Sequence, residues 1–269
     1  MTHGPLPADD HVHTQFSWDT GALASMEAAC RHAHSLGLPS VAFTEHLDLS
    51  PWYVPPDSLH MFPRGGADYV GVDSTFRAPT IDLSAYFEEV ERCRALFPSL
   101  RILTGVEFGE PHWFADDLAA LLAGGRFERV LGSLHSLEIE GTPRVVDEWF
   151  HTARVEGDAE TEAVRAYLAE LARLADADGG FQVVAHIDYL ARQIRQAGRA
   201  HDPRPFEEEY RVAFSALARS GRVLEINARL PLDPLLVRWW YEVGGEAVSF
   251  GSDAHTPEAV GRGFADAAA

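Results

Sequence analysis

Seven short apolar runs, rich in β-branched residues, recur along the chain, and polar residues follow them. Nearly continuous apolar runs of this kind are typical of strands that are buried on both faces of a parallel sheet. Segments with helical periodicity lie between the runs, and this alternation predicts an α/β fold. The predicted strands cover residues 10–14, 40–46, 101–107, 129–135, 181–186, 222–227 and 247–253.

The segments between the runs carry the punctuation of helices. Gly37, Pro98 and Gly221 each follow such a segment, where helices commonly end. A sheet that closes would form a barrel with its active site at the carboxyl ends of the strands, and a doubly wound open sheet is the alternative. We expect residues 1–269 to form a single domain. The predicted helices cover residues 23–36, 84–97, 160–177, 206–220 and 234–243, and a short last helix begins at Thr256.

The charge of the chain limits its partners. With 41 acidic and 22 basic residues, the formal net charge is -19. This charge argues against nucleic-acid or anionic-membrane partners, which need a basic surface. The sequence has no apolar run of about 20 residues and no signal-peptide pattern at its start. Cys30 and Cys93 fit free thiols in a reducing compartment. We therefore expect a cytoplasmic protein that acts on a small substrate.

Side chains able to bind metal ions gather where the predicted strands end. Because the carboxyl ends of parallel strands face one way, these side chains can converge. Six of the thirteen histidines lie at these positions. The strand-end residues are His11, His13, Glu45, His46, Glu107, His135, His186, Asn227, Asp253 and His255.

Two pairs spaced by one residue strengthen this metal-site hypothesis. In a strand, residues i and i+2 point to the same side, so His11 and His13 can bind one ion. Asp253 and His255 repeat the spacing and would be their neighbours in a closed barrel. Imidazole and carboxylate ligands without thiolate suit Zn, Fe or Mn. Glu107 could bridge two ions, and bridged ions can hold a hydroxide and clamp a phosphoester.

The ordered set of motifs resembles the PHP (polymerase and histidinol phosphatase) superfamily and is similar to its monofunctional histidinol-phosphate phosphatases. The resemblance covers nearly the whole chain, and it implies a distorted (β/α)7 barrel of PHP type. The matching motifs are DHVHT at 10–14, FSWD at 16–19, FTEHLD at 43–48, GVEF at 105–108, GSLHS at 132–136, VAHID at 184–188, LEIN at 224–227 and GSDAH at 251–255.

The resemblance also implies three divalent transition-metal ions, Zn, Fe or Mn, and their ligands. Asp48 and Glu45 are nearby carboxylates that could replace Asp19 as a ligand. The implied reaction is hydrolysis of L-histidinol phosphate to L-histidinol and phosphate by a metal-bridging hydroxide. The implied ligands are His11, His13, Glu107 and Asp253 for the first ion, Glu107, His135 and His186 for the second, and Asp19, His46 and His255 for the third.

Further residues are candidates for contacts with the substrate. Arg192 and Arg229 follow strand ends, and a planar guanidinium matches phosphate; Arg195 competes with Arg192 for this role. Besides Glu107, the catalytic candidates are Asp253 and His255, either of which could pass a proton to the leaving alkoxide. Trp113 and the long segment 50–83, which carries Trp52, Tyr53 and Phe62, could contact the leaving group. A core or surface role for Trp113 and a surface excursion for the segment are the alternatives.

Other functions remain open from the sequence. The same site could act on another small phosphomonoester, a nucleotide or a phosphodiester. A non-catalytic domain that only binds metal would be expected to have lost ligands, and this chain retains all nine. A metal-dependent amidohydrolase usually needs a lysine that bridges the metals, and this chain has no lysine.

Overall fold

The computed structural model describes residues 6–21, 24–61, 66–153, 155–230 and 232–267. Within them, seven parallel strands form one sheet in the order β1-β2-β5-β6-β9-β10-β11. All seven predicted strands are therefore confirmed. Their bounds are β1 Asp9–Val12, β2 Ser40–Leu47, β5 Arg101–Gly109, β6 Arg129–Ser133, β9 Val183–Val184, β10 Val223–Asn227 and β11 Val248–Gly251.

The ends of this sheet meet, so the sheet forms a nearly closed barrel. Val12 pairs with Ala254 in a parallel bridge. The backbone N–H of His13 donates to the carbonyl of Ala254 at 2.9 Å, and the N–H of Asp253 donates to the carbonyl of His11 at 2.9 Å. This pairing confirms the predicted barrel and excludes the alternative of an open sheet. The two paired segments are the ones that carry the i, i+2 motifs, so closure brings the motifs together.

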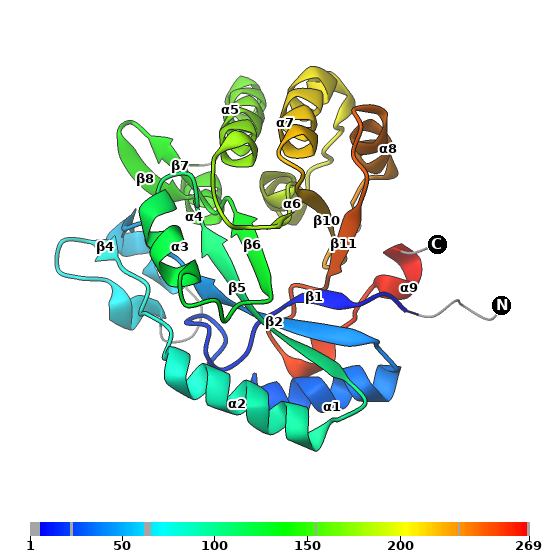
Figure 1. Cartoon of the computed structure of the whole chain (residues 1–269). Helices are drawn as coiled ribbons and strands as arrows, with labels where there is room; N and C mark the ends of the chain where they lie inside the picture. The colour runs from blue at the N-terminus through cyan, green and yellow to red at the C-terminus, as the bar shows by residue number, and fades with distance from the viewer. Residues whose placement is uncertain (1–5, 22–23, 62–65, 154, 231, 268–269) are drawn as a thin grey trace.

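Helices surround the barrel on two sides (Figure 1). α1 and α2 pack below β1, β2 and β5, whereas α5, α7 and α8 lie across the other side. No described helix is long and apolar enough to cross a membrane. The helices are α1 Met26–Leu36, α2 Leu83–Leu96, α3 Ala115–Leu122, α4 Val146–Thr152, α5 Asp158–Asp176, α6 Tyr189–Gln196, α7 Glu207–Arg219, α8 Pro234–Glu242 and α9 Phe264–Ala267.

Two apolar clusters hold the helices on the sheet. One joins α1 and α2 to β1, β2 and β5 around Met26, Phe43 and Val90. Burying side chains of this size stabilises the fold by roughly 1.5–3 kcal/mol each relative to exposure. Tyr86 also donates a hydrogen bond from its hydroxyl to the carbonyl of Phe43 at 2.7 Å. These contacts fix β2 and β5, whose ends carry the site.

The predicted elements differ from the observed ones mainly at their ends and in short segments. β9 is much shorter than the predicted strand 181–186, and the backbone leaves the extended region at His186, where φ is +24°. α2 begins at Leu83, one residue before the predicted start, and Asp82 caps it by accepting from Ala85 N–H at 3.1 Å. The short last helix predicted from Thr256 is a 3-10 helix, Pro257–Ala259. α3, α4, α6 and α9 were not predicted; each has no more than 8 residues.

Two irregular excursions follow the carboxyl ends of β2 and β6. The segment 50–83 contains strands β3 Trp52–Tyr53 and β4 Thr75–Phe76 and two 3-10 helices, Pro56–Met61 and Gly66–Tyr69. Phe62 lies outside the described residues. The second excursion is a hairpin of β7 Ser136–Ile139 and β8 Thr142–Val145. The two contact each other through β3 and β8, above the end of the barrel where the strands finish.

Candidate metal centre

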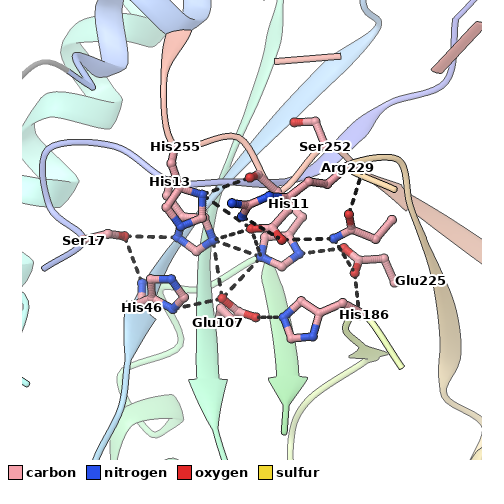
Figure 2. A network of polar contacts seen from close by, with 12 residues as sticks. His11, His13, Ser17, His46, Glu107, His186, Glu225, Arg229, Ser252 and His255 are labelled. Atoms are coloured by element: carbon pink, nitrogen blue, oxygen red, sulfur yellow. Dashed lines mark hydrogen bonds and ion pairs between the residues drawn. The ribbon is translucent and has the colours of Figure 1, made fainter. Parts of the chain in front are cut away.

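Glu107, near the carboxyl end of β5, lies at the centre of a buried cluster (Figure 2). Its register partner in β2 is His46, so both side chains emerge on the same side of the sheet. One carboxylate is thus surrounded by five imidazoles. The distances are 3.3 Å, 3.4 Å and 3.0 Å from Oε2 to His11 Nε2, His13 Nε2 and His46 Nδ1, and 2.7 Å and 3.4 Å from Oε1 to His186 Nε2 and His135 Nε2.

Two further carboxylates complete the cluster. Asp253 Oδ1 lies 3.7 Å from His13 Nε2. Asp19 Oδ2 lies 2.8 Å from His255 Nε2 and 3.4 Å from His46 Nε2. The structure therefore brings all nine predicted ligand residues into one cluster, although they are spread from position 11 to position 255.

The donor set suits divalent cations. His11 Nε2 and His13 Nε2 lie only 3.0 Å apart. His11 Nδ1 is already engaged by Glu225 at 2.6 Å and His13 Nδ1 by Ser17 Oγ at 3.1 Å, which leaves the Nε2 atoms to share a ligand. Four triads have ligand atoms within 4.8 Å of one another: His11–His13–Asp253, His11–Glu107–His186, His46–Glu107–His135 and His13–His46–His255.

A buried carboxylate oxygen without a hydrogen-bond partner also indicates a cation site. Glu107 Oε2 is buried and has no hydrogen-bond partner among the described residues, and burying a carboxylate oxygen in this way is costly. A cation between the carboxylate and the imidazoles would satisfy it. The residues present therefore fit bound transition-metal ions.

Carboxylates behind the cluster orient its imidazoles. Glu225 accepts from His11 Nδ1 through Oε1 and from the backbone N–H of His186 at 2.7 Å through Oε2. Asp48 accepts from His135 Nδ1 at 3.0 Å. Such partners fix the tautomer and direction of a metal-binding imidazole. The role of Glu225 was not predicted, although its motif at 224–227 is part of the family resemblance. Its place two residues before the strand-end Asn227 was the available signal.

The two carboxylates considered as substitutes for Asp19, Asp48 and Glu45, have hydrogen-bond partners of their own. Asp48 faces His135, as above, and its Oδ2 accepts from Trp18 Nε1 at 3.0 Å. Glu45 accepts from the backbone N–H of Thr14 at 2.9 Å and from Ser17 Oγ at 2.6 Å. Asp48 also lies 3.7 Å from His46 Nδ1, so Asp19 and Asp48 each contact two histidines of the cluster, whereas Glu45 is engaged by Thr14 and Ser17.

A glycine makes room for the contact between β1 and β10. A Cβ on Gly251 would lie 2.1 Å from Glu225 Oε1 and 2.6 Å from His11 Cβ. Neither atom can move away without breaking the His11–Glu225 bond. The glycine of the GSDAH motif is therefore required by the orientation of His11.

The electrostatics of the cluster reflect its burial. Burial lowers the pKa of His11, but the charges of Glu225 and Glu107 outweigh burial and hold it well above its usual value. Burial and three neighbouring imidazoles lower the pKa of His13 well below its usual value. Burial raises the pKa of Glu107, yet the surrounding histidines bring it well below its usual range. The lowered pKa values of Glu107 and His13 favour the carboxylate and the neutral imidazole, the forms that bind metal, whereas the raised pKa of His11 shows that the acidic groups around it call for a positive charge.

Two residues of the cluster have unusual backbone conformations. His186 has φ of +24° and Asp253 φ of +53°, a region that costs a non-glycine residue roughly 1–3 kcal/mol. Backbone hydrogen bonds from each N–H, to Glu225 and to the carbonyl of His11, hold them there. The strain sits at the two points where the chain turns side chains into the cluster.

A cavity of about 400 Å³ opens above the cluster. Arg192 and Arg229 both line it. The Arg192 guanidinium is buried and lies 3.2 Å from Asp253 Oδ2 and 3.1 Å from Asp188 Oδ1, whereas Arg229 is 55% exposed and lies 3.7 Å from Asp253 Oδ2. Arg195 is not among the lining residues.

The aromatic part of the cavity differs from the prediction. Trp18 and Trp52 line it, so the excursion 50–83 does reach the site. Trp113, which we expected to contact the leaving group, is not a lining residue; its Nε1 instead donates to Glu170 at 2.9 Å. Tyr53 is 40% exposed and is also absent from the lining.

Comparison with known proteins matches this arrangement to a family. A family model described as PHP domain matches residues 9–229. The histidinol-phosphatase of Lactococcus lactis subsp. lactis (strain IL1403) is 26% identical over 259 residues, covering 92% of this chain and 83% of that protein. A probable histidinol-phosphatase of Clostridium acetobutylicum is 25% identical over 271 residues, covering 96% and 90%.

Solved structures share the fold. The crystal structure of histidinol phosphate phosphatase from Lactococcus lactis, complexed with zinc, L-histidinol and phosphate, has a TM-score of 0.70 at 23% identity and covers 94% of this chain and 88% of that one. A putative histidinol phosphatase from Listeria monocytogenes has a TM-score of 0.75 at 22% identity, with coverage of 96% and 99%.

Proposed function

The chain belongs to the PHP domain family, and on that premise we propose that it is a metal-dependent phosphomonoesterase whose substrate is L-histidinol phosphate. The observation that carries the proposal is the buried carboxylate of Glu107, whose two oxygens face five imidazoles. The substrate is supported by the names of the relatives and by the zinc, L-histidinol and phosphate in the Lactococcus lactis structure.

Three sets of side chains would hold three divalent ions. Glu107 belongs to two of the sets and would bridge them. When bound, such ions polarise phosphoryl oxygens and lower the pKa of water, which provides a nucleophile at neutral pH. The sets are His11, His13, Glu107 and Asp253; Glu107, His135 and His186; and Asp19, His46 and His255.

Arg192 and Arg229 would bind the phosphate in different ways. Arg192 is held by Asp188 and Asp253, so its guanidinium is fixed before substrate arrives and can present its remaining N–H groups to a phosphoryl oxygen. The Arg229 side chain is largely exposed, and its one ion pair with a residue that the structure describes is the long contact with Asp253. It is free to turn toward the phosphate once the cavity is filled.

Asp253 is better placed than His255 to transfer a proton to the leaving alkoxide. Nearby charges, mainly His11, hold the pKa of Asp253 below its usual range against the effect of burial. His255 has its Nδ1 2.9 Å from the backbone carbonyl of Asp253 and its Nε2 against Asp19. We assign Asp253 Oδ2, which contacts Arg192 in the cavity, to take a proton from the attacking water and to pass it to the leaving alkoxide.

Phosphate release from a panel of esters tests the proposal. Protein stripped with a chelator is reloaded with Zn, Mn or Fe and assayed with L-histidinol phosphate, a sugar phosphate, a nucleotide and a phosphodiester. We expect turnover only after metal is restored, and fastest with L-histidinol phosphate. Equal activity in stripped protein would overturn the metal requirement, and a preference for the nucleotide or diester would overturn the substrate.

A further inference from the structure

The outer part of the cavity contains a carboxylate that forms no direct ion pair with the described residues. Asp147, at the start of α4, lines the cavity and is half-buried. Its Oδ1 accepts from the backbone N–H of Glu148 at 2.7 Å. Among the residues that the structure describes, no arginine or histidine forms an ion pair with it. Burial raises the pKa of Asp147, and the backbone N–H of Glu148 and the charges of His135 and His151 offset this effect only in part.

The neighbouring acid shows that this lack is specific to Asp147. Glu148 also lines the cavity, but Arg144 binds its Oε2 at 2.7 Å. Asp48, deeper in the cavity, is likewise engaged, by His135 and Trp18. Of these three acids in the lining, Asp147 is the one without an ion pair to a described residue. A cationic ligand could supply that pair.

The position of Asp147 relative to the metal cluster is well defined. The N–H of Val146 donates to the carbonyl of His135 at 2.8 Å, so Asp147 follows directly on a residue anchored to a predicted ligand. Tyr189 is near both, with its ring 5.6 Å from that of His135 and its pKa raised by burial and by the charge of Asp147. Asp147, His46, His135 and Asp253 line the same cavity of about 400 Å³, so one ligand in it can contact both the cluster and Asp147.

The remaining wall is aromatic. Trp18 and Trp52 line the cavity, and each indole N–H is already used, by Asp48 at 3.0 Å and by Ser136 Oγ at 2.7 Å. Their rings can therefore offer the ligand only apolar and π surfaces, which suit an ammonium group or a planar ring.

We propose that Asp147 selects phosphomonoesters whose alcohol carries a protonated amine, by pairing with the ammonium while the phosphate lies at the metal cluster. The inference rests on the proposed function and extends it to a residue that determines specificity. A carboxylate in a site that must accept a dianion repels the substrate unless a cation comes with it. Asp147 thus disfavours nucleotides and sugar phosphates, which bring no such cation, and favours an amino alcohol ester.

Two esters that differ by one amino group test this selection. The metal-loaded enzyme is assayed with L-histidinol phosphate and with 3-(imidazol-4-yl)propyl phosphate, which lacks the amine. In Asp147→Asn, we expect kcat/KM for the amino ester to fall by about 10- to 100-fold, the range for a lost charge-assisted hydrogen bond. The value for the ester without the amine should change by less than about threefold.

A matched control removes the same charge outside the cavity. Glu138, on β7, is exposed and is not a lining residue, so Glu138→Gln should leave both esters unchanged. Calorimetry gives a second readout: L-histidinol should bind Asp147→Asn about 10- to 100-fold more weakly, with binding of inorganic phosphate unchanged. An equal loss for both esters, or a wild type that does not distinguish them, overturns the role of Asp147.

Failure of the proposed function would look different. It would appear as a metal-loaded wild type that releases phosphate from neither ester. In that case the binding of L-histidinol still decides the inference, because the affinity of wild type and Asp147→Asn can be compared without turnover. Equal affinities would contradict the pairing.

Discussion

The floor and the outer wall of the cavity are built in opposite ways. The floor consists of the nine clustered side chains at or near the strand ends, which contact one another through ring nitrogens and carboxylate oxygens. The outer wall comes from Trp18 after β1, the excursion 50–83, the end of the β7–β8 hairpin, the start of α4 and one face of α6. On the proposed function, the floor would bind the phosphate group, which all phosphate esters share, and the wall would contact the alcohol, which differs between esters.

This difference separates chemistry from specificity. Side chains on paired strands are held by the sheet and by buried hydrogen bonds, so their positions are established before substrate binds. The wall residues lie on short elements joined by irregular chain, where sequence can change at little cost to the fold. Substitutions in the floor should therefore abolish turnover, and substitutions in the wall should alter substrate preference.

The largest effect is expected for Glu107→Gln. The amide keeps the shape but loses the charge that five imidazoles face, so metal content should fall and kcat should drop by at least about 10³-fold. Phosphate release and metal analysis by mass spectrometry measure both quantities, and circular dichroism checks the fold. Wild-type turnover in this variant would remove Glu107 from the mechanism and erase the distinction between floor and wall.

The floor could be predicted from sequence because chain order alone aligns the ends of parallel strands. His46 and Glu107, for example, are register partners at the ends of two long apolar runs. The wall was predicted only in part. Trp52, in the segment 50–83, does line the cavity, but Asp147 sits on an element too short for periodicity to reveal. Trp113 was also a candidate for the wall, and the structure places it against Glu170 instead.

Glu225→Gln should have an intermediate effect. Glu225 is not predicted to contact the substrate, but it orients His11 and the backbone of His186. Loss of such a partner typically weakens metal binding or activity by about 10- to 100-fold. Titration of the stripped variant with zinc should show the weaker affinity. Unchanged zinc affinity would mean that the sheet alone orients the imidazoles.

A smaller effect, confined to the wall, is expected for Trp52→Phe. The new ring can still stack on Phe76, which lies 5.1 Å from the indole, but the bond to Ser136 Oγ is lost. We expect kcat/KM to fall by roughly 3- to 10-fold, mainly through KM, with metal content unchanged. A fall in kcat accompanied by loss of metal would show that wall and floor are coupled.

The smallest effect should come from a histidine–carboxylate contact outside the cavity. Glu170 accepts from His112 at 2.7 Å and from Trp113, and these bonds together with Arg173 lower its pKa to about 2, against the effect of partial burial. A depressed carboxyl pKa adds stability above the unfolded value of 4.5, and this stability is lost as pH falls toward 2.

Because Glu170 is partly solvated, its contribution is screened, and we expect Glu170→Gln to lower the free energy of unfolding by about 1 kcal/mol at pH 7. Urea denaturation should show this difference shrinking as the pH is lowered from 5 to 3, while metal content and turnover stay at wild-type values. A loss of bound metal in this variant would contradict the view that a histidine beside a carboxylate binds metal only where several strand ends converge.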